Sequence, residues 1–160
     1  MNKQFYSLAI IGGAGHVGLP LSLLLADLGN QVKIIDLDRE ALKKIGNGIF
    51  PFSEMGGNEL LEKVLKTKKL SFSTNHKDVK DCDVIILTVG TPVDEHLNPN
   101  LESIYSAVNE IKPYLKNNQT IIFRSTLFPG TSEKISRLLS NDGLEIGISF
   151  CPERIAQGYA

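Results

Sequence analysis

Residues 13–18 read Gly13-Ala14-Gly15-His16-Val17-Gly18, which is the pattern G-x-G-x-x-G. The apolar run before it, residues 6–11, predicts a buried strand. A helix is predicted after it, ended by Gly29-Asn30, with an apolar stripe made by Val17, Leu21, Leu24, Leu25 and Leu28. A glycine pattern between a strand and a helix indicates a loop that holds the phosphates of a dinucleotide.

Each glycine of the pattern has its own physical reason. Gly13 permits the tight turn after the strand, Gly15 lets a pyrophosphate approach the backbone, and Gly18 lets the helix pack close to the sheet. The amino terminus of the helix presents unpaired N–H groups and the positive end of the helix dipole. We therefore expect Gly13, Gly15 and Gly18 to form the phosphate-binding part of a cofactor site.

An acidic residue stands where the adenosine ribose is expected. Asp36 follows a second predicted strand, residues 31–35, and lies 18 residues beyond Gly18. A carboxylate about 20 residues after the loop accepts hydrogen bonds from the ribose hydroxyls and repels a 2′-phosphate, so NAD is predicted rather than NADP. Arg39 keeps the alternative open, because a nearby arginine can accommodate that phosphate. The other interpretation is that Arg39 is solvated or lies along the adenine.

The rest of the chain continues the alternation of strands and helices. Further strands are predicted over residues 70–72, 83–89, 120–123 and 146–150. Further helices are predicted from an N-cap at Asp38 and over residues 58–66, 101–115 and 130–139. This order predicts an α/β fold, a doubly wound parallel sheet of the Rossmann NAD-binding type, as a single domain over residues 1–160.

Composition excludes several classes of function. The 160 residues suit one domain, and 42% hydrophobic with 22% charged residues is typical of a soluble globular protein. A net charge of −1 argues against a nucleic-acid or membrane-surface partner. The apolar runs have the length of strands and no signal peptide is recognised, so we expect a cytoplasmic protein. Two cysteines and three histidines show no ligand spacing, so we expect neither a disulfide framework nor a metal site.

Three later motifs follow the predicted fourth, fifth and sixth strands. They are Val89-Gly90-Thr91-Pro92, the run from Ser125-Thr126 to Gly130-Thr131, and Cys151-Pro152-Glu153-Arg154-Ile155-Ala156-Gln157-Gly158. Parallel sheets of this type bind ligands at the carboxyl ends of their strands. The motifs are therefore expected along the rim that holds the glycine loop.

Together with residues 13–20, this ordered set resembles the UDP-glucose / UDP-N-acetylmannosamine dehydrogenase family, the nucleotide-sugar 6-dehydrogenases, in their N-terminal NAD-binding domain. Residues 51–54 and 70–74 resemble that family as well, whereas Gly90 and Met55 depart from it. The resemblance implies oxidation of the C6 alcohol of a UDP-sugar to a carboxylate with two NAD. In that family a cysteine captures the intermediate aldehyde, and water hydrolyses the resulting thioester.

The resemblance also implies roles for individual residues. It assigns cofactor contacts to His16, Val17, Asp36, Thr91, Ser125 and Thr126, the hydrolytic water to Thr126 and Glu153, and the sugar nucleotide to Arg154 and Ile155. Glu153 suits a general base if its surroundings raise its pKa toward neutrality. Two alternatives remain: Thr126 caps the helix that begins near Gly130 or closes a turn, and Glu153 is a surface carboxylate paired with Arg154.

The same motif bears on the substrate. Arg154-Ile155 favours UDP-N-acetylmannosamine or a related N-acetylhexosamine, with UDP-glucose as the alternative. The family's nucleophilic cysteine, central helix and UDP-binding domain would lie beyond Ala160, so Cys82 is interpreted as structural and Cys151 is not taken as the nucleophile. We expect a fragment that binds NAD without turnover. A homodimer is expected for the longer protein, since the missing helix would form its interface, and the fragment is compatible with a monomer.

Two rival interpretations keep the dinucleotide site but change the function. A β-hydroxyacid or phosphogluconate-type dehydrogenase shares the glycine loop, yet gives no reason for residues 125–131 or for Pro152-Glu153-Arg154. A stand-alone module that senses NAD or NADH needs a partner surface, and no basic recognition helix follows the sixth strand. A gene that ends at codon 160 would favour the sensor, and a longer reading frame the dehydrogenase.

Overall fold

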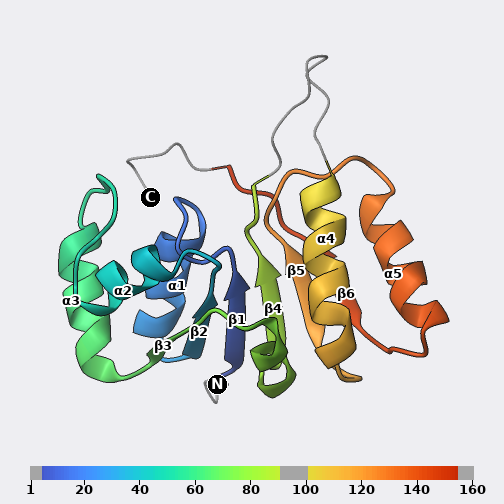
Figure 1. Ribbon diagram of the computed structural model, residues 1–160, viewed down its shortest axis with the longest axis horizontal. Coiled ribbons are helices and arrows are strands. Elements are labelled where there is room, and N and C mark those ends of the chain that lie inside the picture. The colour runs from blue at the N-terminus through green and yellow to red at the C-terminus, as the bar shows by residue number, and fades with distance from the viewer. Residues whose placement is uncertain (1–4, 91–100, 155–160) are drawn as a thin grey trace.

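The chain forms one parallel sheet whose strand order is β3-β2-β1-β4-β5-β6 (Figure 1). The computed structural model describes residues 5–90 and 101–154. The strands are β1 (Ser7–Ile11), β2 (Gln31–Ile35), β3 (Leu70–Ser73), β4 (Val84–Leu87), β5 (Thr120–Phe123) and β6 (Gly147–Phe150), and every neighbouring pair is parallel. This order confirms the predicted doubly wound α/β sheet.

Helices cover the two faces of the sheet from opposite halves of the chain. They are α1 (Gly18–Asp27), α2 (Arg39–Gly46), α3 (Gly57–Thr67), α4 (Glu102–Ile111) and α5 (Thr131–Asn141), with short 3-10 turns η1 (His76–Asp81) and η2 (Lys112–Tyr114). One core joins α1, α2 and α3 to residues such as Ile10 and Ile34, and the other joins α4 and α5 to Ile85 and Phe123. From β1 the chain proceeds toward one edge of the sheet, and from β4 it proceeds toward the other edge. Because crossovers between parallel strands are right-handed, the two directions place the helices of the two halves on opposite faces.

The apolar stripe predicted for α1 lies only partly against the core, since Leu21 and Leu25 pack on it as partly buried residues. The residues of α1 that face the core are Gly18, Leu19, Ser22, Leu23 and Ala26. By contrast, Leu24 and Leu28 are 53% and 48% exposed. The helix carries large apolar residues on most of its sides, so their spacing does not select one face. The buried side of α1 therefore combines small residues, which allow a close approach to the sheet, with two fully buried leucines.

Two helix boundaries show how local chemistry acts. Asp38 is the predicted N-cap of α2, and its Oδ1 accepts a hydrogen bond from the Ala41 N–H at 2.9 Å, which confirms the prediction. The helix predicted over residues 101–115 ends earlier, because α4 stops at Ile111 and gives way to η2, which contains Pro113. Proline has no N–H to donate, so it favours the tighter turn there.

The carboxyl ends of all six strands lie along one edge of the sheet, at the top of Figure 1. The glycine loop follows β1, Asp36 follows β2, and residues 88–90 follow β4. Residues 124–126 and 151–154 follow β5 and β6. Segments that are far apart in the sequence are thus brought to a common rim. Within the described residues, no helix combines the length and the apolar character needed to cross a membrane.

Candidate functional site

The tight turn after β1 is made by Gly12, one residue earlier than the sequence pattern suggested. Gly12 has a φ of 76°, in the left-handed region that favours glycine, whereas Gly13 does not have a positive φ. Gly13 is needed for another reason, since a Cβ there would lie 2.9 Å from the Ile10 carbonyl oxygen and 2.9 Å from Ile34 Cγ2. Both glycines therefore serve the packing of the loop against the sheet.

Gly15 and Gly18 differ in what surrounds them. A Cβ on Gly18 would lie 2.5 Å from the Gly12 carbonyl oxygen and 2.6 Å from Gly13 Cα, so the fold leaves no room for a side chain. A Cβ on Gly15 would meet only the Gly12 carbonyl oxygen, at 3.5 Å, which is an ordinary contact. The fold does not require glycine at position 15. The open space beside it suits the close approach of a pyrophosphate to the backbone.

Hydrogen bonds hold the glycine loop in place from two neighbouring strands. The Thr88 hydroxyl, after β4, donates to the carbonyl oxygens of Ile11 and Gly12, at 2.8 and 3.0 Å. Asp36, after β2, accepts the Ala14 N–H at 3.0 Å through Oδ2 and the Asp38 N–H at 3.0 Å through Oδ1. No side chain caps the first turn of α1. The Leu19 N–H donates to the Gly15 carbonyl oxygen at 2.9 Å and Pro20 has no N–H, so among the described residues the N–H groups left for an anion are those of His16, Val17 and Gly18.

A cleft of about 320 Å³ opens beside Asp36, a volume typical of small-molecule sites. Gly12, Asp36 and Leu37 form one wall, and Val89 and Gly90 form another. The ends of β1 and β2 add Ile11 and Ile35, and η1 and α4 add His76, Ser103, Ser106, Ala107 and Glu110. A cleft bounded by the predicted ribose ligand and the loop after β4 has the position expected for the adenosine half of NAD.

Two serines fix the backbone that borders this cleft. Ser125 donates from its hydroxyl to the Val89 carbonyl oxygen at 2.6 Å, and Ser103 donates to the Gly90 carbonyl oxygen at 2.8 Å. Ser125 was predicted to lie beside the nicotinamide as a cofactor contact. In the structure its hydroxyl hydrogen is used to tie the end of β5 to the end of β4.

An ion pair joins the ends of β5 and β6. Arg124 binds the Glu153 carboxylate through Nη2, and through Nη1 it donates to the Cys151 carbonyl oxygen at 3.0 Å and contacts Cys151 Sγ at 3.2 Å. The Glu153 N–H donates to the Arg124 carbonyl oxygen at 3.1 Å, and Glu153 Oε1 accepts the Arg154 N–H at 2.7 Å. Burial lowers the pKa of Arg124, but the bonds to Cys151 and Glu153 outweigh it and raise that pKa.

This ion pair changes the expectation for Glu153. As a general base, Glu153 was expected to have surroundings that favour its protonated form. Its neighbour is instead Arg124, and a positive charge favours the ionised form of a carboxyl group. The pair is partly buried, with side-chain exposures of 17% for Arg124 and 22% for Glu153. Glu153 is thus held as an oriented carboxylate whose two oxygens have different donors.

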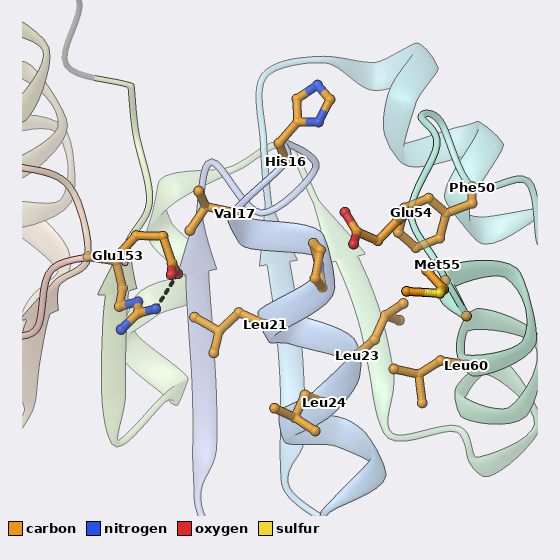
Figure 2. A pocket seen from close by; sticks show the side chains of 14 residues that line it. His16, Val17, Leu21, Leu23, Leu24, Phe50, Glu54, Met55, Leu60 and Glu153 are labelled. Atoms are coloured by element: carbon orange, nitrogen blue, oxygen red, sulfur yellow. Dashed lines mark hydrogen bonds and ion pairs between the residues drawn. The ribbon is translucent and has the colours of Figure 1, made fainter. Parts of the chain in front are cut away.

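A hollow of about 190 Å³ connects Glu153 with the glycine loop. Figure 2 shows it straddling α1, with Glu153 on one side of the helix and Glu54 and Met55 on the other. His16 and Val17 line the hollow at the start of α1, and the His16 ring stacks on Phe52 with centroids 4.0 Å apart. His16 therefore ties the glycine loop to the segment that precedes α3.

The remaining predicted site residues are placed as follows. Thr126 is exposed after β5, Arg154 is exposed after Glu153, and Arg39 is exposed at the first position of α2. Thr91 and Ile155 lie outside the described residues. The capping alternative for Thr126 is wrong, because α5 starts at Thr131 without a side-chain cap. The alternative that pairs Glu153 with Arg154 is also wrong. The ion pair of Glu153 is with Arg124, and Arg154 contributes only its backbone N–H.

Sequence reasoning missed three residues that shape the site: Gly12, Thr88 and Arg124. All three stand directly after a predicted strand or at its end, which is the position that selected the other site residues. Position alone could therefore have pointed to Thr88 and Arg124. Among the described residues, no group of three or more His, Cys, Asp and Glu side chains is arranged to hold a metal ion.

The two cysteines differ in accessibility, and we expect them to react differently. Cys82 is buried and Cys151 is exposed. Burial raises the pKa of the Cys82 thiol, which lowers its thiolate fraction at neutral pH. With a colorimetric disulfide reagent at pH 7.5, one thiol should react at once and the second only after addition of denaturant. Cys151→Ser should remove the fast phase, and a fast phase that persists in this variant would contradict the assignment.

Comparison with known sequences finds similarity to the NAD-binding domain of a family of sugar-nucleotide dehydrogenases. A model of the UDP-glucose/GDP-mannose dehydrogenase family, NAD binding domain, matches residues 7–160. The UDP-N-acetyl-D-mannosamine dehydrogenase of Methanococcus aeolicus is 36% identical over 98% of this chain, and the UDP-glucose 6-dehydrogenase YwqF of Bacillus subtilis is 31% identical over 92%. The chain spans only 36% and 34% of the lengths of these two relatives.

Solved structures give the same result. A UDP-D-ManNAc dehydrogenase from Pyrococcus horikoshii superposes with a TM-score of 0.86 at 31% identity, over 94% of this chain and 37% of that one. A GDP-mannose dehydrogenase from Pseudomonas aeruginosa superposes with a TM-score of 0.86 at 28% identity, over 95% of this chain and 37% of that one. The similarity thus covers nearly all of this chain and about a third of each neighbour.

Proposed function

Because this chain belongs to the UDP-glucose/GDP-mannose dehydrogenase family, as its NAD-binding domain, we propose that it forms the cofactor-binding part of a UDP-sugar 6-dehydrogenase. The reaction converts a C6 alcohol to a carboxylate with one water molecule, and the four electrons reduce two NAD. The observation that carries the proposal is the meeting of the glycine loop, Asp36 and the Arg124–Glu153 pair on one rim of the sheet.

The residues present fit NAD. NAD supplies a hydride acceptor when it is bound. The backbone at Gly15 and the uncapped start of α1 would hold its pyrophosphate. Asp36 accepts two backbone N–H groups, and its remaining lone pairs would accept hydrogen bonds from the ribose hydroxyls. A carboxylate at this position would repel the 2′-phosphate of NADP. Arg39 is exposed three residues further on, and within residues 5–90 and 101–154 it forms no ion pair with Asp36.

Glu153 would act on the water that completes the reaction. Held by Arg124 and by the Arg154 N–H, its carboxylate can accept a hydrogen bond from that water and fix its position. The ion pair with Arg124 fixes the orientation of this carboxylate, so its proposed part is to position the water. Thr126 follows β5, two residues after Arg124, and is exposed to solvent. Its hydroxyl could donate a hydrogen bond to the same water.

The substrate is proposed to be a UDP-N-acetylhexosamine, UDP-N-acetylmannosamine first. Arg154-Ile155 supports this preference, and the Methanococcus aeolicus relative bears the name of such an enzyme. UDP-glucose is the second candidate, supported by the Bacillus subtilis relative at 31% identity. An exposed arginine at position 154 suits a sugar nucleotide that carries two phosphates.

The test uses the product of the complete gene and follows NADH by absorbance. It compares UDP-N-acetylmannosamine, UDP-N-acetylglucosamine, UDP-N-acetylgalactosamine and UDP-glucose. We expect two NADH per sugar with an N-acetylhexosamine and much slower turnover with UDP-glucose. Fast turnover with UDP-glucose alone would overturn the substrate proposal, and NAD binding without turnover of any UDP-sugar would overturn the reaction. The 160-residue chain by itself is expected to form no NADH.

A further inference from the structure

Three polar side chains from η1 and α4 meet in the wall of the cleft beside Asp36. His76, in η1, contacts Glu110 of α4 with 2.8 Å between Nδ1 and Oε2. The Ser106 hydroxyl, one turn earlier in α4, donates to Glu110 Oε1 at 3.1 Å. All three residues line the same cleft as Asp36 and Gly90. The His76 side chain is only 15% exposed, so it belongs to the wall of the cleft rather than to the open surface.

Glu110 fixes which nitrogen of His76 faces a ligand. A carboxylate can only accept, so the hydrogen of the neutral imidazole lies on Nδ1 and is donated to Glu110. Nε2, on the other side of the ring, is then a hydrogen-bond acceptor. No described residue donates a hydrogen bond to it. Glu110 is therefore a positioning residue, and His76 is the residue that could touch a bound molecule.

The side-chain donors of this cleft are already used. Ser103 donates to the Gly90 carbonyl oxygen, and Ser106 donates to Glu110. The described lining residues include no lysine or arginine. Among them, the side-chain groups that remain for a ligand, on Asp36, His76 and Glu110, are acceptors. A ligand that reaches His76 is best matched by a group that donates hydrogen bonds, because a facing acceptor would leave the Nε2 lone pair of this largely covered side chain unpaired.

We propose that Nε2 of His76, held by Glu110, accepts a hydrogen bond from the exocyclic amine of adenine and so selects adenine among purine dinucleotides. The proposal rests on the proposed cofactor site, in which Asp36 binds the adenosine ribose. Leu37, Val89 and His76 line the same cleft as Asp36, so a nucleoside whose ribose binds Asp36 would place its base in this cleft. Hypoxanthine carries a carbonyl oxygen in place of that amine and would place acceptor against acceptor.

The experiment compares NAD with nicotinamide hypoxanthine dinucleotide by titration calorimetry at pH 8. The unmodified protein should bind NAD about tenfold more tightly, the size expected for one satisfied hydrogen bond against one unpaired acceptor. His76→Phe should keep the fold, checked by circular dichroism, and bring the two affinities within about twofold of each other. Most of that change should come from weaker binding of NAD.

Glu110→Gln is the matched control, because its amide oxygen can still accept from Nδ1 and keep Nε2 as the acceptor. It should retain the preference for NAD. A preference that survives unchanged in His76→Phe, or that disappears fully in Glu110→Gln, would overturn the proposal while leaving NAD binding intact. A folded protein that binds neither dinucleotide would instead overturn the cofactor site on which it rests.

Discussion

Gly18→Ala should lower the free energy of unfolding by about 3 kcal/mol, the upper part of the range for overpacking a rigid site. The added Cβ would lie 2.5 Å from the Gly12 carbonyl oxygen, 2.6 Å from Gly13 Cα and 2.8 Å from Thr88 Oγ1. The first two atoms belong to the backbone of a loop that β1, β4 and Asp36 hold, so they cannot rotate away. The start of α1 would have to move off the sheet.

Urea denaturation followed by circular dichroism measures this loss. Gly90→Ala is the matched control, because a Cβ there meets no atom within 4 Å and Gly90 has no positive φ. Its stability should stay the same or rise by up to about 1 kcal/mol, through a less flexible unfolded chain. Equal stability of the two variants would show that α1 does not depend on close contact with the glycine loop.

Gly15→Ala should leave folding almost unchanged and weaken NAD binding by about 10- to 100-fold, which corresponds to roughly 1–3 kcal/mol of steric cost. The Cβ has an ordinary 3.5 Å contact with the Gly12 carbonyl oxygen, so the protein itself accommodates it. The same methyl group would occupy the space that a pyrophosphate needs beside the loop. The two glycine variants therefore separate a role in folding from a role in binding.

Titration calorimetry of Gly15→Ala with NAD, after a urea curve that shows wild-type stability, is the appropriate measurement. Wild-type affinity in a stable Gly15→Ala protein would mean that the pyrophosphate does not lie against this loop. A large loss of stability would instead mean that Gly15 belongs with Gly18 among the residues that the packing requires.

Much of this fold could be predicted because short apolar runs alternate with helical stretches, and because motifs follow β1, β4, β5 and β6. The parallel sheet and the common rim at the carboxyl ends of its strands follow from those two facts. The buried face of α1 could not be predicted, because large apolar residues occur on both its buried and its exposed sides. The turn at Gly12 could not be separated from Gly13 either, since φ depends on how the loop meets Thr88.

The pairs that shape the rim depend on register, which the sequence does not state. Arg124 reaches Cys151 and Glu153 because Phe123 is aligned with Phe150 in the β5–β6 pair. His76 meets Glu110 because η1 and α4 flank the same cleft, although the two residues lie 34 positions apart. A residue that was named for its motif, such as Glu153, could be found from the sequence, but its partner could not.

The most direct test of the account is titration of the 160-residue chain with NAD and with NADP in the calorimeter. The site built from the glycine loop and Asp36 predicts one NAD per chain and at least about tenfold weaker binding of NADP, because the Asp36 carboxylate faces the 2′-phosphate. No heat of binding with NAD in a folded protein would contradict the site. Equal affinity for NADP would contradict the role given to Asp36 and would indicate that Arg39 accommodates the 2′-phosphate.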